Sequence, residues 1–570
     1  MNELSPKLRS FCSAARGSAW LFASCLVLGA CSSSSDGGPQ PSGGGANAAG
    51  TGNVSGGSSS AGTGNANAGA GNGLPAAGSN ASGGSNGASG APSSGAGGGT
   101  SQGGLDSGGQ GGAGPVSNVS LTPHAVTLSA GKAFNVADDL FDDGFIPPSP
   151  LANFGFQTPI ISIVRADGAL DVAWLDYTSV KGKPFALPSP GMIYITHIDP
   201  TLATGTTVAT GITSYRLLGF TSDPSGAFYL AYSADHPQKN ATDGDYNAVN
   251  GNELKIAKST SADFTSKAWD KLVFGDQDNN TVGSKGEPGA GGSGVLGFDV
   301  MNQKLVLYVA HQMTWKDDTT PNKIQRHQAG YFGYFDPSTG EQAKAGGNNT
   351  SQTGAGWFYS HNFNQRLLID QGVSYTLAHG DAYDRQLGFS AWTLDSYSKK
   401  NNTTFDQSYL EIAGAEGDNK TDTETGQFIK LDDGRFVIVH TTAQDRTARD
   451  VRIVLANGTT GATLSEAWLT TNTGNVQAMM PKLEVLGDKL LVTYGLWDST
   501  QRTNKKIDWN SQLVDLTLKP VGAAKVATGI EFAPSSPLFR FPAGPSAGGV
   551  GWVSGNAMHT LSVNVASSAP

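Results

Sequence analysis

The chain of 570 residues carries 47 acidic and 37 basic side chains, giving a formal net charge of −10 at pH 7, and it has three cysteines. The negative balance argues against nucleic acid and anionic lipid surfaces as partners. The length allows two or three average domains or one large repeat architecture.

The first 30 residues have the layout of a cleaved export signal. Lys7, Arg9 and Arg16 make a positively charged start, and a short apolar run follows over residues 19–30. This run is about half the length that a helix needs to span a bilayer. The segment is therefore expected to be removed and to take no part in the fold.

The apolar run ends in Leu28-Gly29-Ala30-Cys31, which resembles the lipobox of bacterial lipoproteins. The resemblance implies that Cys31 takes up lipid, diacylglycerol and palmitate, and anchors the mature chain to a membrane. In that family, Ser32 in place of aspartate implies the outer membrane, with the chain facing the periplasm or the cell surface. The alternative is an ordinary secretory signal that happens to end in cysteine.

Residues 31–118 are predicted to form a disordered tether. Gly, Ser, Ala and Asn dominate them, and Asp36 and Asp106 are their only charged residues. Such a composition buries too little apolar surface to offset the entropy cost of ordering. As a Gly-rich coil the tether would reach roughly 50 Å. Because Cys12 and Cys25 leave with the signal, we expect no disulfide and no cysteine metal site beyond the anchor.

Residues 119–570 contain a repeated unit, in which an apolar strand, a tight turn and a second strand of β-branched and aromatic residues follow one another. Each unit reads as a β-hairpin, and a third strand often follows, as in residues 192–198 and 254–258. The clearest copies turn at Gly168, Gly226, Asn302, Gly372, Gly434 and Gly487, and a weaker copy surrounds Gly549 and Trp552.

The number and spacing of the units predict an all-β fold, a seven-bladed β-propeller over residues 119–570. The six steps from Gly168 to Gly549 average about 64 residues, and no long amphipathic helix interrupts them. Seven antiparallel units of this size are typical of a propeller with substantial loops. The alternatives are a large β-sandwich or two β domains.

The stretch from Ser261 through Asp263 to Trp269 resembles the Asp-box of sialidase-like propellers. In that family the motif is a hairpin turn pinned by its Ser and Asp, with the Trp packed beneath, and it supports the fold rather than the chemistry. This copy has one extra residue and lacks the motif's glycine. No sialidase arginine triad or nucleophilic tyrosine can be placed, so no sialidase activity is inferred.

Three histidines close the second strand of consecutive units: His311, His379 and His440. Equivalent positions on neighbouring blades gather around the propeller axis, so these imidazoles are candidate ligands for a divalent metal such as zinc. The alternative is that they hydrogen-bond to loop backbone. Two runs of alternating Asp and Asn, residues 243–247 and 276–280, have the oxygen ligands that calcium prefers but lack the full pattern of an EF-hand.

A polar patch lies between the strands of the fourth unit. It contains His361, Arg366, Asp381, Tyr383 and Arg385. The two arginines can hold a carboxylate or sulfate in bidentate fashion, and the tyrosine can serve as an acid or base if its pKa is perturbed. These five residues are the predicted binding site.

Two functions fit this pattern. The first is a membrane-anchored propeller that binds a glycan, a peptide or a partner protein on its loop face. The second is a metal-assisted enzyme, a lyase or hydrolase of acidic polysaccharide. The chain has no phosphate-binding loop, no dinucleotide fingerprint and no Gly-x-Ser-x-Gly elbow, which removes several common enzyme classes. Catalytic residues, the ligand and the oligomeric state stay open.

Overall fold

The computed structural model describes residues 118–129, 131, 160–176, 190–234, 253–261, 264–274, 289–316, 324–343, 358–360, 362–380, 387–394, 409–411, 423–459, 461–498, 500, 507–530, 536–556 and 560–568. The export signal, Cys31, the tether and residues 243–247 and 276–280 lie outside this description. Within it, no helix is long and apolar enough to cross a membrane.

The described chain forms seven four-stranded antiparallel sheets, which are the blades of a propeller. Blade 1 contains β2 (Ile160–Val164), β3 (Leu170–Leu175), β4 (Gly191–Ile198) and β5 (Gly205–Ser214). Blade 2 contains β6 (Arg216–Ser222), β7 (Phe228–Ala234), β8 (Glu253–Ser259) and β9 (Lys267–Phe274). Blade 3 contains β10 (Gly289–Asp299), β11 (Lys304–Lys316), β12 (Ile324–Phe335) and β13 (Phe358–Ser360).

The remaining blades follow the same order. Blade 4 contains β14 (Asn362–Asp370), β15 (Val373–Gly380), β16 (Leu387–Thr393) and β17 (Tyr409–Glu411). Blade 5 contains β18 (Glu424–Lys430), β19 (Phe436–Thr442), β20 (Asp450–Ala456) and β21 (Thr463–Trp468). Blade 6 contains β22 (Val476–Leu486), β23 (Lys489–Asp498), β24 (Ile507–Val514) and β25 (Pro520–Val526). Blade 7 contains β26 (Phe539–Arg540), β27 (Val550–Asn556), β28 (Thr560–Ser568) and β1 (Val119–Thr127).

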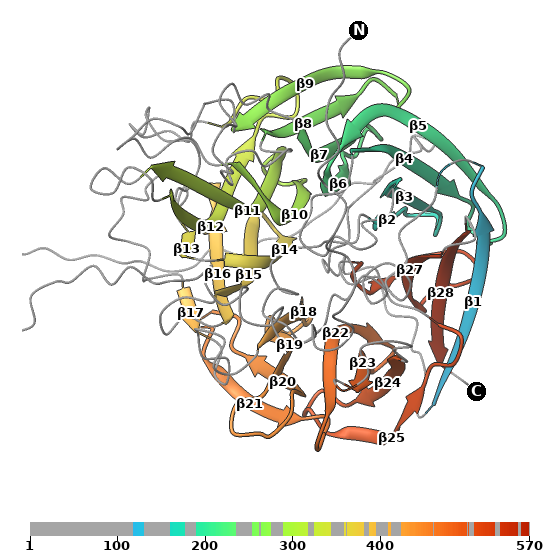
Figure 1. Cartoon of the computed structure of the whole chain (residues 1–570). Helices are drawn as coiled ribbons and strands as arrows, with labels where there is room; N and C mark the ends of the chain where they lie inside the picture. The colour runs from blue at the N-terminus through green and yellow to red at the C-terminus, as the bar shows by residue number, and fades with distance from the viewer. Residues whose placement is uncertain are drawn as a thin grey trace, which may run out of the picture. The chain divides into compact units, whose positions relative to one another are not determined.

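The seven-bladed fold predicted from the repeat is confirmed, and the sandwich and two-domain alternatives are excluded. The innermost strands β2, β6, β10, β14, β18 and β22 pack against one another in turn, and β26 and β27 of blade 7 close the ring between β22 and β2 (Figure 1). The first strand, β1, pairs with β28 and so completes the last blade. The ring is thus closed by strands from both ends of the propeller sequence.

The blades pack through apolar faces that the sequence alternation provides. Fully buried tryptophans recur on the strands, and two of them are held in the same way: the indole of Trp174 donates to Thr196 Oγ1 and that of Trp392 to Thr376 Oγ1, both at 2.9 Å. Burying such a ring removes a large apolar surface from water, while the threonine satisfies its one polar atom. Blades 1, 4, 6 and 7 each carry one fully buried tryptophan, the other two being Trp497 and Trp552.

Turns between the third and fourth strands share an Asp or Asn that caps its own loop. Asp199, Asp336, Asn457 and Asp515 each accept a hydrogen bond from the backbone N–H two residues further on. A short acidic or amide side chain suits this role because it reaches back to the turn backbone. The stretch that resembles the Asp-box joins β8 to β9, and Asp263 within it lies outside the described residues. Trp269, on β9, donates to the Pro337 carbonyl of blade 3 at 3.3 Å.

Replacing Asp515 with alanine should cost about 1 kcal/mol of unfolding free energy at pH 7. The carboxylate accepts from the Thr517 hydroxyl and from the backbone of Thr517 and Lys519, and these bonds lower its pKa. A lowered pKa contributes stability above the unfolded value of about 4, and this contribution is lost as the pH falls further. Urea unfolding from pH 3 to 7 measures this. Asp515→Asn keeps an acceptor oxygen but lacks the charge, so it should lose less stability than the alanine variant at pH 7 and approach wild type toward pH 3, and an equal loss in both variants would contradict the prediction.

The two ends of the propeller differ. At one end, here called the hairpin end, short turns join the first and second strands of each blade, as at residues 165–169, 223–227 and 431–435. At the other, the loop end, several longer segments join the second to the third strand or one blade to the next, including residues 176–190, 235–252 and 275–288. Innermost strands begin at the loop end and run to the hairpin end.

Candidate functional site

Five innermost strands carry a β-bulge near the loop end. The register shifts lie between Leu217 and Gly219, Ala290 and Gly294, Phe363 and Arg366, Thr425 and Phe428, and Met479 and Lys482. A bulge adds residues on one strand and re-aims its side chains. Because the bulges lie at matching positions, the side chains at and beside them surround the axis. The polar ones are here called the polar ring and form the candidate site: Ser293, Gln365, Arg366, Gln427 and Lys482.

Arg366, a predicted binding residue, lies at the bulge of β14. Its Nε donates to the Gly426 carbonyl of blade 5 at 2.9 Å, and its Nη1 donates to the Gln365 carbonyl at 3.1 Å. A Cβ at Gly426 would lie 2.3 Å from the Val439 carbonyl and 2.6 Å from the Pro481 carbonyl, so the close approach of blades 5 and 6 here requires glycine. Burial lowers the Arg366 pKa to about 10. No acidic side chain of the described chain lies within ion-pair distance of this guanidinium.

Glu424, at the start of β18, is the acid whose charge acts on Arg366. Its Oε2 accepts from Arg449 at 3.3 Å and from the Met480 backbone N–H of blade 6 at 2.9 Å. Arg449, almost completely buried, stands just before β20. Glu424 therefore pairs with Arg449 and ties blade 5 to blade 6, and its charge also raises the pKa of Arg366 without a direct ion pair.

Lys482, at the bulge of β22, adds a second cation near the axis. It is 5% exposed, and its ammonium donates to the Ser536 carbonyl. Burial and the charge of Arg366 both lower the Lys482 pKa, and Glu424 opposes them. The ammonium and the guanidinium carry like charges, and their repulsion disfavours the protonated form of Lys482.

Further hydrogen bonds connect the ring to the segment that precedes β26. Gln427 donates to the Leu538 carbonyl and accepts from the Leu538 N–H, both at 3.0 Å, which links blade 5 to blade 7. The Ser293 hydroxyl donates to Gln365 between blades 3 and 4. The polar ring thus positions its own charged members by joining neighbouring blades.

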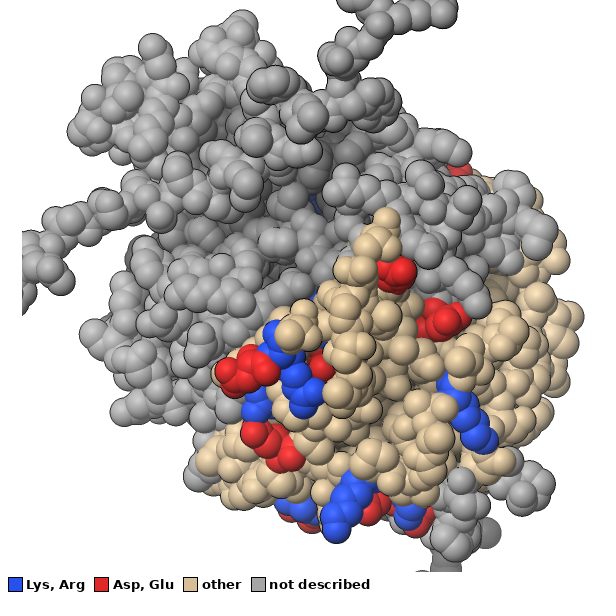
Figure 2. Space-filling model, turned by 60° about the horizontal axis from the view of Figure 1, so that its bottom comes forward, with Lys and Arg blue, Asp and Glu red and all other residues tan. Residues whose placement is uncertain are grey.

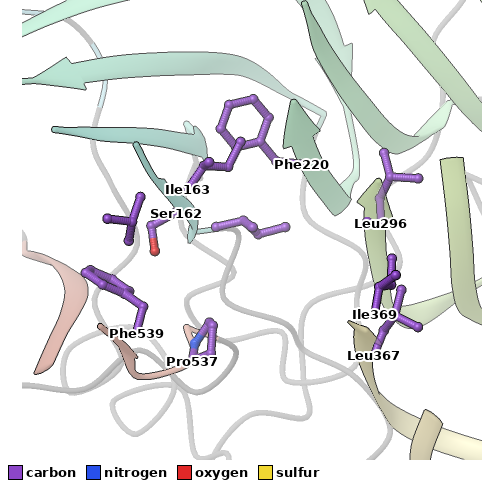
Figure 3. Close-up of a pocket in the computed structure, with 11 residues that line it drawn as sticks. Ser162, Ile163, Phe220, Leu296, Leu367, Ile369, Pro537 and Phe539 are labelled. Carbon is purple, nitrogen blue, oxygen red and sulfur yellow. The ribbon is translucent and has the colours of Figure 1, made fainter. Parts of the chain in front are cut away.

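Toward the hairpin end the axis becomes apolar. A cavity there is lined by side chains from several blades, and Figure 3 shows Ile163, Phe220, Leu296 and Leu367 converging with Pro537 and Phe539. The cavity leaves about 20 Å³ for a molecule the size of water, too little for a sugar ring. A ligand of the ring therefore has to approach from the loop end.

The three predicted metal ligands occupy equivalent positions, as the repeat indicated. His311, His379 and His440 pair with Ala290, Phe363 and Thr425, the last residues before the bulges of their blades. The side chains of His311 and His379 lie outside the described residues. His440 is completely buried.

The surroundings of His440 bear on the metal hypothesis. Its cross-strand neighbour on β20 is Arg452, and directly opposite residues present their side chains to the same face of a sheet. A guanidinium beside an imidazole disfavours a cation at that point. Within the described part of the chain no group of three His, Cys, Asp or Glu side chains is placed to hold a metal. Metal binding by these histidines stays a prediction.

Of the predicted polar patch, the structure describes Arg366. Residues His361, Asp381, Tyr383 and Arg385 lie outside the described residues. Strand β15 ends at Gly380 and β16 begins at Leu387, so the chain between them leaves from the loop end of blade 4, the end at which Arg366 lies.

Sequence reasoning missed Lys482, Glu424, Arg449 and Ser536. A signal was present: three copies of the repeat open with Gln365, Gln427 or Lys482, polar residues at or beside the bulge. Polar side chains at matching places in strands that become innermost indicate the axis. Elsewhere, on the described part of the face in Figure 2, basic and acidic side chains are interspersed.

No family model matches this chain, and no curated protein matches it. Among solved structures, an ulvan lyase, a polysaccharide lyase, is similar at 11% identity over 65% of this chain and 81% of its own, with a TM-score of 0.39. A protein of unknown function from Dyadobacter fermentans is similar at 9% identity over 69% and 98%, with a TM-score of 0.36. The Trypanosoma rangeli sialidase is similar at 12% identity over 62% and 54%, with a TM-score of 0.35. With TM-scores this low, none of these structures supports assigning an activity to this chain.

Proposed function

We propose that this protein is an exported propeller that binds an acidic glycan at its loop end. The observation that carries the proposal is Arg366, a partly buried guanidinium that is oriented by two backbone carbonyls, has no acid of the described residues at bonding distance and has Lys482 nearby. A buried charge is costly unless an opposite charge compensates it. A carboxylate or sulfate group supplies that charge and fits the fork of an arginine.

The chain's overall charge narrows the class of ligand. A net charge of −10 repels densely charged polyanions at long range, while the polar ring offers local positive charge. A glycan whose acidic groups are separated by neutral sugar atoms satisfies both conditions. The apolar floor favours insertion of one acidic group rather than threading of the polymer through the axis.

We also propose that lipid on Cys31 anchors the protein at the outer membrane. The lipobox resemblance and the tether support this. Incorporation of labelled palmitate in the producing cells tests it, with Cys31→Ser as the comparison. Labelling of both forms, or of neither, would contradict the anchor. Protease treatment of intact cells separates the surface from the periplasmic side.

Replacing Arg366 with glutamine should weaken binding of an acidic oligosaccharide by at least about tenfold, or about 1.4 kcal/mol. The probes are an oligogalacturonate and a sulfated galactan oligosaccharide, titrated calorimetrically into the full chain. The methyl ester of the oligogalacturonate, which lacks the charge, should not bind. Arg435→Gln removes an exposed arginine that pairs with Asp433 in a hairpin turn and should leave binding unchanged.

The outcomes of that titration are distinct. Binding by wild type that Arg366→Gln leaves intact would place the ligand elsewhere. Binding of the methyl ester as tight as that of the acid would contradict a charged ligand. Absence of binding to either acidic probe would reject the proposed ligand class.

The matching register of the three histidines favours a second candidate, a metal-assisted lyase or hydrolase of acidic polysaccharide. Zinc would be held by His311, His379 and His440, with bonds of about 2 Å to each. Elemental analysis of the purified full chain tests this. A stoichiometric divalent metal that is lost in His379→Ala would support the enzyme hypothesis. Metal-free protein would reject a metal-assisted enzyme and leave glycan binding as the proposed function.

A further inference from the structure

Ser536 is a buried serine whose hydroxyl makes no hydrogen bond. The residue is 1% exposed, and its Oγ has no partner among the described residues. Leaving such a group unpaired costs free energy comparable to a lost hydrogen bond. Other buried serines of the described residues share this state, and what distinguishes Ser536 is its position beside the Lys482 ammonium.

The same serine is joined to the polar ring through its backbone. Its carbonyl accepts from the Lys482 ammonium, and the charge of Arg366 acts on that ammonium. Ser536, Lys482 and Arg366 belong to blades 7, 6 and 4 and are brought together near the axis. Two cations and a hydroxyl that can donate make a site for an oxyanion rather than for a cation or a neutral group.

The segment that carries Ser536 is fixed in place. Leu538 makes two backbone hydrogen bonds to the Gln427 side chain, and Pro537 and Phe539 line the apolar cavity (Figure 3). Ser536 therefore lies at the boundary between the cationic ring and the apolar floor. Beyond this level the side chains that line the cavity are apolar except for Ser162, so a charged group that enters from the loop end meets Ser536 and Lys482 first.

We infer that Ser536 and Lys482 form the inner end of the binding site and take one oxygen of the ligand's acidic group, while Arg366 takes another. This inference rests on the proposed function and extends it. The ligand group is an oxyanion, either a uronate carboxylate or a sulfate ester, and it enters singly. Ser536 then sets specificity, because its hydroxyl can donate a hydrogen bond only to an oxygen that reaches the floor of the site.

Ser536→Ala tests the inference in the full chain by calorimetric titration with the two acidic oligosaccharides. Affinity for the probe that wild type binds should fall about fivefold, the value of one hydrogen bond of about 1 kcal/mol. The unfolding free energy should stay equal or rise, because an unpaired buried hydroxyl is removed. The probe that binds more tightly identifies the source as carboxylate or sulfate.

Ser390→Ala is the matched control, since Ser390 on β16 is also a buried serine whose hydroxyl lacks a partner. It should leave affinity unchanged. Ser536→Cys, nearly equal in size, replaces the alanine variant if that variant folds poorly. Affinity within twofold of wild type in either Ser536 variant, with binding lost in Arg366→Gln, overturns the inference but leaves the proposed function. Failure of wild type to bind either probe overturns both.

Discussion

Replacing Glu484 with glutamine should stabilise the folded protein by about 3 kcal/mol above pH 7. Glu484 lies on β22 two residues beyond Lys482, and it is 4% exposed. Burial raises its pKa from 4.5 to about 7, although the Val485 N–H and the charge of Arg540 act in the opposite direction. The folded state therefore prefers the protonated acid, and glutamine reproduces that neutral form.

The sign of the pH dependence follows from the raised pKa. An acid that binds its proton more tightly when folded contributes most below its unfolded value of about 4.5. Its penalty grows as the pH rises from there to about 7 and is constant above. Wild type and Glu484→Gln should thus have similar stability at pH 4.5, and the difference should reach its full size near pH 8.

Urea unfolding at pH 4.5, 6, 7 and 8 measures this difference. Glu341→Gln is the control, because Glu341 is an exposed acid that pairs with Lys271, and such surface pairs contribute little. Its stability should follow wild type at every pH. A stability difference for Glu484→Gln that does not change between pH 4.5 and 8, or a loss of stability at pH 8, would show that Glu484 is ionised and compensated.

The repeat could be predicted from the sequence because the turn and the two strands of each unit are adjacent in the chain. Turn residues such as Gly168, Gly226 and Gly434 adopt positive φ, which glycine does without strain, and each stands between two apolar strands. Counting such turns therefore gave the number of blades. The third-strand segments predicted at 192–198 and 254–258 also formed strands, β4 and β8.

The site was less readable because it depends on which strand becomes innermost. In β22, Lys482 and Glu484 alternate with Leu483 and Val485, a pattern typical of a strand with one face in water. An innermost propeller strand is covered on both faces by its neighbours, so both charged side chains are buried. Arg366 was found because other polar residues surround it in the sequence, whereas Ser536 has no such neighbours.

Ring closure was also outside the reach of the repeat pattern, because the strand that completes blade 7 comes from the opposite end of the propeller sequence. Strand β1 begins at Val119, directly after the segment predicted to be the tether. If Cys31 is anchored as we propose, a pull on the anchor acts first on β1 and on the closure of the ring. The contacts of β1 therefore matter for more than the stability of one blade.

Val126→Asp tests that closure and should lower the unfolding free energy by about 4 kcal/mol, because it buries an unpaired charge. Val126 is 2% exposed in β1 and packs on Gly205 of blade 1, where a Cβ would lie 2.5 Å from its Cγ1. Urea unfolding gives the loss, and hydrogen exchange should show β28 opening first. Ser120→Asp, on the exposed part of β1, should stay within about 0.5 kcal/mol of wild type. Equal small effects in both variants would mean that the ring holds without β1, and that blade 7 closes through β26 and β27 alone.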